Sequence, residues 1–157
     1  MNIPAIYIAI WPRNHDWMAY EIRFITKGYG SHAAFVRQNG KIAENFYPHV
    51  RERDWKPGER AQVEVYKIPC TQAEVDRLES WLDLQIQHPP KYSVADLFRY
   101  AFNLPPAKGI GCFCSQWVLR GVRINLAPEH QPLVWLEYQD FAPPTQLRSS
   151  PALLHAD

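Results

Sequence analysis

The tripeptide Gln38-Asn39-Gly40 constrains the fold of this chain most strongly, because it predicts where the chain reverses direction. Asparagine and glycine tolerate the left-handed backbone that tight β-turns require. The segments 31–36 and 41–46 flank this turn. We therefore expect them to form two antiparallel strands joined by a short loop.

The length of the loop decides which side chain lies beside His32. A two-residue loop turns Glu44 away from His32 and gives Asn45 the same face as the histidine. A three-residue loop, with Gly40 left-handed in a bulge, places Glu44 diagonal to His32 on one face. The turn residues alone leave both registers open.

Further strands are expected where apolar runs or apolar–polar alternation are bounded by turn residues. The segments 6–10, 20–24 and 62–67 have such patterns, and a short strand-like run occupies 134–138. Lys56-Pro57-Gly58 has the composition of a turn ahead of the third segment. These strands and the hairpin together predict a sheet.

Three helices are expected beside the sheet. Thr71 with Glu74 forms a capping box, and apolar residues then recur at helical spacing up to a proline pair. Ser93 repeats a similar start signal for a second helix. A third helix is expected over 113–120, with Gly121 ending it. Strands and helices together predict an α+β fold.

Length and composition indicate one globular domain spanning 1–157, since 46% of the 157 residues are hydrophobic. The formal net charge of +1 supplies no field for nucleic acid, so no nucleic-acid partner is expected. The apolar segment 3–11 follows no basic region and is shorter than the roughly 20 residues that span a bilayer. We expect a buried strand there, no stable membrane insertion and a cytoplasmic protein; the patterns do not indicate an oligomeric state.

The three cysteines, Cys70, Cys112 and Cys114, lack the spacing of a disulfide framework. Cys114 stands where a glycine-containing loop enters the third predicted helix, and free N–H groups and the macrodipole at a helix start favour the thiolate. Cys114 is therefore a candidate nucleophile, although a free cysteine is more commonly a small buried apolar residue. Cys112 precedes the expected helix start and is a weaker candidate.

A cysteine nucleophile needs a base, and His32 is the candidate, since the small residues Ser31, Ala33 and Ala34 would let another segment approach its ring. A lone histidine is nevertheless more often structural. A metal held by Cys112, Cys114 and a histidine lacks the second ligand pair of a structural zinc site, so no metal or cofactor is expected. Surface positions are the default for the other histidines: His15, His49, His88, His130 and His155.

Four segments resemble the circularly permuted NlpC-type papain-like clan, which includes bacterial cell-wall peptidase relatives and the lecithin–retinol acyltransferase group. The segment 22–36 (Ile-Arg-Phe-Ile-Thr-Lys-Gly-Tyr-Gly-Ser-His-Ala-Ala-Phe-Val) is similar to the histidine motif of that clan. The segment 114–118 (Cys-Ser-Gln-Trp-Val) resembles its Cys-Ser-Glu-Leu-Val helix start, from which Gln116 and Trp117 depart. The segments 91–97 and 140–147 resemble its flanking regions, so the likeness covers about residues 5 to 147.

The resemblance implies an antiparallel sheet packed against helices in a permuted papain-like fold, with the nucleophile at a helix N-terminus. It implies that Cys114 is the nucleophile, that His32 is the base and that Glu44, twelve positions after His32, is the third polar residue. Asn45 is the alternative third residue if the hairpin has a two-residue loop.

The expected activity is thiol-dependent hydrolysis of amide or ester bonds in a small peptide, amide or lipid-ester substrate. Three alternatives stay open. The same site could serve an acyltransferase or lipid-ester hydrolase of the clan. The fold could instead act as a non-catalytic module that binds a peptide or lipid, or the chain could be a metal-bound structural protein.

Overall fold

The computed structural model describes residues 3–11, 32–101, 114–131 and 154–155. Six antiparallel strands form one sheet in the order β4-β3-β2-β1-β5-β6. The strands are β1 Ala5–Trp11, β2 His32–Val36, β3 Ile42–Phe46, β4 His49–Arg53, β5 Glu64–Pro69 and the two-residue β6 Leu154–His155. The helices are α2 Gln72–Gln87, α3 Val94–Ala101 and α4 Cys114–Asn125, with short 3₁₀ turns η1 Glu59–Gln62 and η2 Pro128–His130.

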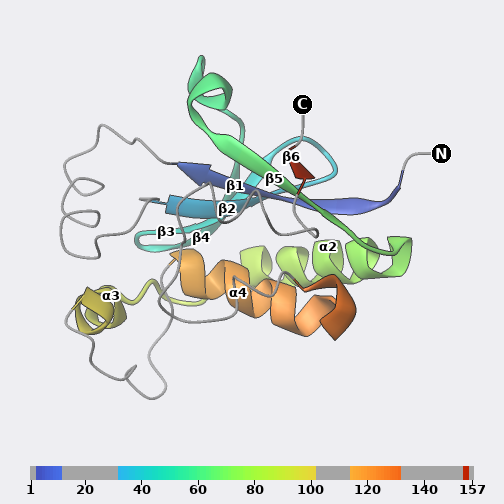
Figure 1. Cartoon of the computed structure of the whole chain (residues 1–157). Coiled ribbons are helices and arrows are strands. Elements are labelled where there is room, and N and C mark those ends of the chain that lie inside the picture. The colour runs from blue at the N-terminus through green and yellow to red at the C-terminus, as the bar shows by residue number, and fades with distance from the viewer. Residues whose placement is uncertain (1–2, 12–31, 102–113, 132–153, 156–157) are drawn as a thin grey trace.

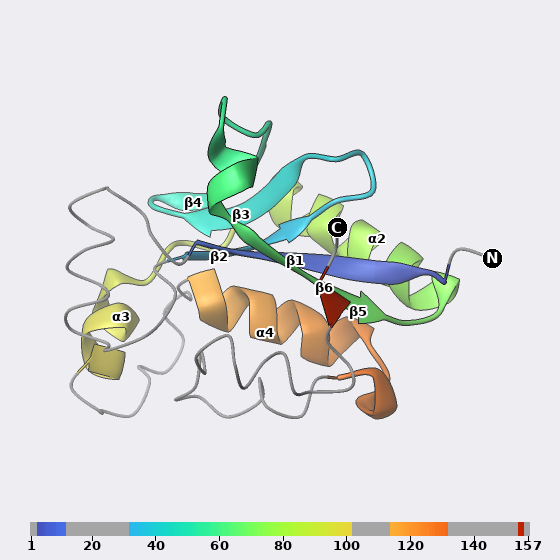
Figure 2. The ribbon, with the colours of Figure 1, turned by 45° about the horizontal axis from the view of Figure 1, so that its top comes forward.

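The α+β class and the packing of an antiparallel sheet against helices are confirmed. Helices α2 and α4 lie side by side against one face of the sheet (Figure 1 and Figure 2). The predicted strands 20–24 and 134–138 lie outside the described residues.

The main core lies between the sheet and these two helices. Strands β1, β2 and β5 contribute apolar side chains such as Ile8, Phe35 and Ile68, and the helices contribute Leu82 and Trp117. A smaller apolar cluster covers the other face of the sheet. Because β1 is buried on both faces, it is a nearly continuous apolar run.

The hairpin between β2 and β3 has the three-residue loop. Ala34 pairs with Glu44, and the N–H of Arg37 donates to the carbonyl of Lys41 at 2.8 Å. Gly40 adopts φ 80°, the left-handed conformation that the bulge requires. The register that places Glu44 on the face of His32 is therefore confirmed, and the two-residue alternative is wrong.

The start of α2 is confirmed as a capping box. The Thr71 hydroxyl accepts the N–H of Glu74, and the Glu74 carboxylate accepts the N–H of Thr71 at 2.7 Å. The two side chains thereby supply acceptors at the helix start, where the N–H groups have no carbonyl four residues earlier in the helix. Val75, Leu78 and Leu82 then follow at helical spacing and are buried, as their periodicity predicts.

The expected end of the third helix at Gly121 is wrong, because α4 continues to Asn125. Gly121 lies within the helix where α4 passes close to two aromatic rings. A Cβ atom at this position would lie 2.8 Å from Trp81 and 2.9 Å from Phe35. The glycine is thus explained by the close packing of α4 against both α2 and strand β2, and not by helix termination.

Gly121→Ala is therefore expected to destabilise the protein, although alanine is the better helix former by about 1 kcal/mol. Displacing the buried Phe35 ring and the partly buried Trp81 ring should cost about 1–3 kcal/mol, and urea denaturation would measure the loss. Ile124→Ala, at an exposed position of the same helix, is the matched control and should change the unfolding free energy little. A Gly121→Ala protein as stable as the parent would contradict the packing explanation.

Candidate functional site

Cys114 is the first residue of α4, and the helix begins at the end of the sheet where β1 ends and β2 starts (Figure 1). Only 7% of the residue is exposed. Its sulfur accepts the backbone N–H groups of Ser115 and Ala33 and a hydrogen bond from His32. The helix start and the β2 strand together therefore surround the sulfur with donors, as a thiolate requires.

His32 links the cysteine to a carboxylate. As the first residue of β2 it lies opposite Trp11 of β1, and its Nε2 atom is 3.0 Å from Oε2 of Glu44. A second hydrogen bond joins the imidazole to Cys114. Because Nε2 is bound to Glu44, the other ring nitrogen, Nδ1, is the one left for the sulfur.

The electrostatics of this pair favour thiolate and imidazolium. Burial opposes both charges, but the mutual hydrogen bond and charge attraction outweigh it. With Glu44 adding to the effect, the pKa of His32 is raised to about 9. The pKa of Cys114 is lowered from its ordinary value, which is the direction predicted for a cysteine at a helix start.

Glu44 is 1% exposed and accepts hydrogen bonds from two strands. Its Oε2 faces His32, while Oε1 accepts from Nε of Arg51 and Nε of Arg53, each at 2.8 Å. Burial alone would raise the pKa of this carboxyl, but the hydrogen bonds from His32 and Arg53 hold it well below its usual range. Glu44 is therefore an ionised acceptor beside the imidazole.

Asn45, the alternative third residue, faces away from the histidine. It pairs with Val50 of β4 and follows Glu44 in the strand, so its side chain points to the opposite face of the sheet. The structure therefore brings Glu44 and not Asn45 to His32, and the Cys-His-Asn arrangement is wrong.

Two aromatic rings flank the imidazole. The ring of His32 lies 5.0 Å from that of Trp11 and 5.6 Å from that of Phe46. The guanidinium of Arg51 covers the Phe46 ring at 4.6 Å. These contacts limit the rotation of the imidazole and exclude water from its hydrogen bonds.

The sequence analysis does not identify the residues that bind Glu44. They are Arg51 and Arg53 of β4, a short polar strand that is not among the predicted ones. It also does not identify Glu59, at the start of η1, which binds Arg53. The sequence does hold one indication of them. Arg51 and Arg53 are two positions apart, and in a strand this spacing puts both cations on the same face. Their target is visible only after strand pairing sets Glu44 opposite Arg51.

Among the described residues, Cys70 and the histidines His49, His88 and His130 do not join this site. Cys70 is buried, and its pKa is raised by burial, so it has the environment of a structural thiol. His49 and His88 are exposed as expected. His130 departs from expectation, because it is half-buried and its Nδ1 lies 2.9 Å from a Glu74 oxygen. Cys112, His15 and the side chain of His155 lie outside the described residues.

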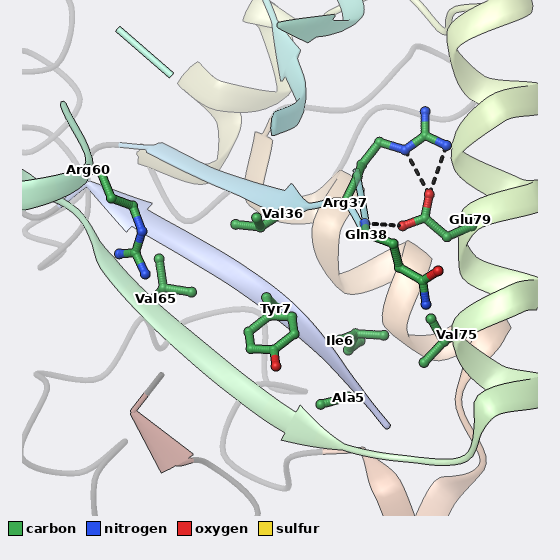
Figure 3. A pocket seen from close by; sticks show the side chains of 10 residues that line it. All are labelled: Ala5, Ile6, Tyr7, Val36, Arg37, Gln38, Arg60, Val65, Val75 and Glu79. Atoms are coloured by element: carbon green, nitrogen blue, oxygen red, sulfur yellow. Dashed lines mark hydrogen bonds and ion pairs between the residues drawn. The ribbon is translucent and has the colours of Figure 1, made fainter. Parts of the chain in front are cut away.

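A pocket of about 280 Å³ lies elsewhere, near the start of β1 and the end of β2 (Figure 3). Tyr7, Val36 and Val65 line it, and the ion pair of Arg37 with Glu79 borders it. None of the three candidate catalytic side chains lines this pocket. The pocket is thus separate from the Cys114–His32 pair.

In the described part of the chain, no three His, Cys, Asp or Glu side chains are grouped as ligands for a metal ion. No helix in the same part of the chain combines the length and apolarity needed to cross a bilayer.

The chain matches no protein-family model, and no curated protein is significantly similar to it. The geometry of Cys114, His32 and Glu44 is therefore the main guide to function.

Proposed function

We propose that this chain is a thiol-dependent hydrolase of amide or ester bonds with a circularly permuted papain-like fold. One observation carries the proposal: a buried cysteine at a helix start bonds a histidine whose second nitrogen bonds an ionised glutamate. Nucleophile, base and orienting group in hydrogen-bond contact are the requirement for covalent acyl transfer. The resemblance of the segments around His32 and Cys114 to the permuted clan supports the same assignment.

The chain order supports the permuted form of the fold. His32 and Glu44 come from the β2–β3 hairpin, which precedes the helix of Cys114 in the chain. An antiparallel sheet packed against that helix is the arrangement that the clan resemblance implies. The proposed fold therefore agrees with the observed order of elements and with their packing.

The first chemical step is acylation. The Cys114 thiolate attacks the substrate carbonyl, and the C–S bond forms as the carbonyl electrons move to oxygen. The N–H of Cys114 at the open end of α4 is the donor that we assign to this oxyanion. The tetrahedral intermediate collapses as imidazolium gives its proton to the leaving amine or alcohol, which leaves neutral His32 and an acyl-enzyme.

Deacylation restores the ion pair. Neutral His32 removes a proton from the attacking acceptor, whose oxygen or nitrogen bonds to the acyl carbon and expels the thiolate. With water as acceptor the enzyme is a hydrolase, and with an alcohol or amine it is an acyltransferase. Glu44 keeps Nδ1 directed at the sulfur in both steps because it binds Nε2.

We expect iodoacetamide to alkylate Cys114 at pH 6 at least about tenfold faster than Cys70, because the thiolate is the reactive form. The pKa of Cys114 is lowered, whereas the pKa of the buried Cys70 is raised. Peptide mass spectrometry after timed quenching measures each rate, and Cys112 is followed in the same digest. Equal rates at all three cysteines would count against the nucleophile assignment.

Cys114→Ala and His32→Ala should each abolish turnover with the fold intact, because each removes one partner of the acyl-transfer step. Glu44→Gln should lower kcat/KM by about 10- to 100-fold, since an amide can still accept from His32 but does not stabilise imidazolium. Incubation with a panel of peptide amides and lipid esters, followed by mass spectrometry of the trapped acyl group, measures both reaction and substrate class.

Cys112→Ala is the matched cysteine control and should retain substantial activity. Circular dichroism of each variant separates loss of chemistry from loss of fold. Full activity in the Cys114→Ala protein would end the hypothesis.

The pH dependence of kcat/KM should be bell-shaped, because acylation needs both thiolate and imidazolium. Activity rises as Cys114 loses its proton at a pH below the ordinary thiol range and falls as His32 loses its proton near pH 9. Initial rates between pH 4 and about 10.5 would trace both limbs. A single limb centred on an unshifted thiol would contradict the ion pair.

A further inference from the structure

We propose that Arg53 and Glu59 are positioning residues that close a ring of contacts around His32 and balance the charge beside it. The ring also includes Glu44 and Trp11. We call His32 and these four residues the histidine clamp. This inference rests on the proposed function, because it concerns the base of the proposed reaction.

The contacts of the histidine clamp can be followed around the ring. Glu44 joins His32 at 3.0 Å through Oε2 and Arg53 at 2.8 Å through Oε1. The two terminal nitrogens of Arg53 reach the two oxygens of Glu59, each at 2.7 Å. The Trp11 indole N–H donates to Oε1 of Glu59 at 3.0 Å. The Trp11 ring then returns to within 5.0 Å of the imidazole.

Each member of the histidine clamp comes from a different element. Trp11 ends β1, His32 begins β2, Glu44 lies in β3, Arg53 ends β4, and Glu59 begins η1. The position of the imidazole thus depends on elements that are distant from Cys114 in the sequence. Arg53 is the central link, since its planar fork binds one carboxylate through Nε and the other through both terminal nitrogens.

The clamp also sets the charge that His32 experiences. Within the described part of the chain, the charged groups around the histidine are Glu44 from β3, Arg51 and Arg53 from β4, and the Cys114 thiolate. Glu59 of η1 adds a second carboxylate through its contact with Arg53. Trp11 and Phe46 also contact its ring but carry no charge. The two arginines offset the two carboxylates.

This balance has a direct consequence for the base. An uncompensated Glu44 would hold the proton on His32 more tightly and hinder its transfer to the leaving group. A net positive surrounding would instead favour the neutral imidazole and weaken its pairing with the thiolate. Arg53 and Glu59 therefore act on His32 in opposite directions.

A purely structural role predicts something different. If Arg53 and Glu59 only fasten β4 to η1, removal of either one breaks the two hydrogen bonds between them and lowers the unfolding free energy. Neither change would then alter the titration of His32. The opposite electrostatic signs of the two residues separate the two explanations.

The test compares two alkylating reagents on the full chain. Iodoacetate is an anion that a neighbouring imidazolium attracts, whereas iodoacetamide is neutral and responds only to the thiolate. The ratio of their rates at Cys114 falls with rising pH as His32 loses its proton. In the parent protein the midpoint of this fall is expected near pH 9.

Arg53→Gln removes a cation and should move the midpoint up by about one pH unit, whereas Glu59→Gln removes an anion and should move it down by about as much. Arg53→Lys keeps the charge without the fork and should return the midpoint towards the parent value. Arg37→Gln is the matched control, because Arg37 also binds several carboxylates (Glu52, Glu79 and Asp83) but does not contact the clamp. It should lower the melting temperature without moving the midpoint.

Opposite shifts in Arg53→Gln and Glu59→Gln would support the clamp. Shifts in one direction, or none, with a lowered melting temperature would overturn it. The measurement needs no substrate, so its outcome is separate from that of the proposed function. Opposite shifts in a protein without turnover would reject the proposed hydrolase function and support the clamp. Turnover with unshifted midpoints would support the hydrolase function and reject the clamp.

Discussion

The rest of the structure depends on the burial of one ionised carboxylate, that of Glu44. A buried charge is strongly unfavourable unless hydrogen-bonded cations compensate for it. Here Arg51, Arg53 and His32 do so from the strands on either side of β3. Strand β4 therefore contributes to the site although it lies at the edge of the sheet, two strands away from β2.

The charge of Glu44 influences the ionisation of Cys114 through the imidazolium that lies between them. The carboxylate stabilises imidazolium, and imidazolium together with the N–H groups of Ser115 and Ala33 stabilises the thiolate. Each charge is favourable only while its neighbour is present, since all three groups are largely withdrawn from water. Helix α4, the β2–β3 hairpin and strand β4 are thus coupled through one line of contacts, and the core between sheet and helices holds them in place.

Local signals were sufficient to predict the parts of this arrangement that a few neighbouring residues determine. The Asn39-Gly40 turn and the Thr71–Glu74 capping box depend on backbone groups within three or four positions, so their patterns were informative. The role of Gly121 cannot be predicted from neighbouring residues, because it depends on the close approach of Trp81 and Phe35, which are distant in the chain. Strand β4 is not recognisable from its own residues for a similar reason, since its polar side chains gain their role only when strand pairing places them beside Glu44.

The hairpin loop is a local feature that determines contacts between distant residues. If the loop were one residue shorter, a neutral amide, Asn45, would face His32, and a neutral acceptor needs no arginine to compensate for it. With Gly40 left-handed and the loop three residues long, a carboxylate faces the histidine instead. The carboxylate then requires Arg53, and the partly buried Arg53 in turn requires Glu59. Because Gly40 is left-handed and the loop has three residues, a network of charged groups lies beside the imidazole and not a single neutral side chain.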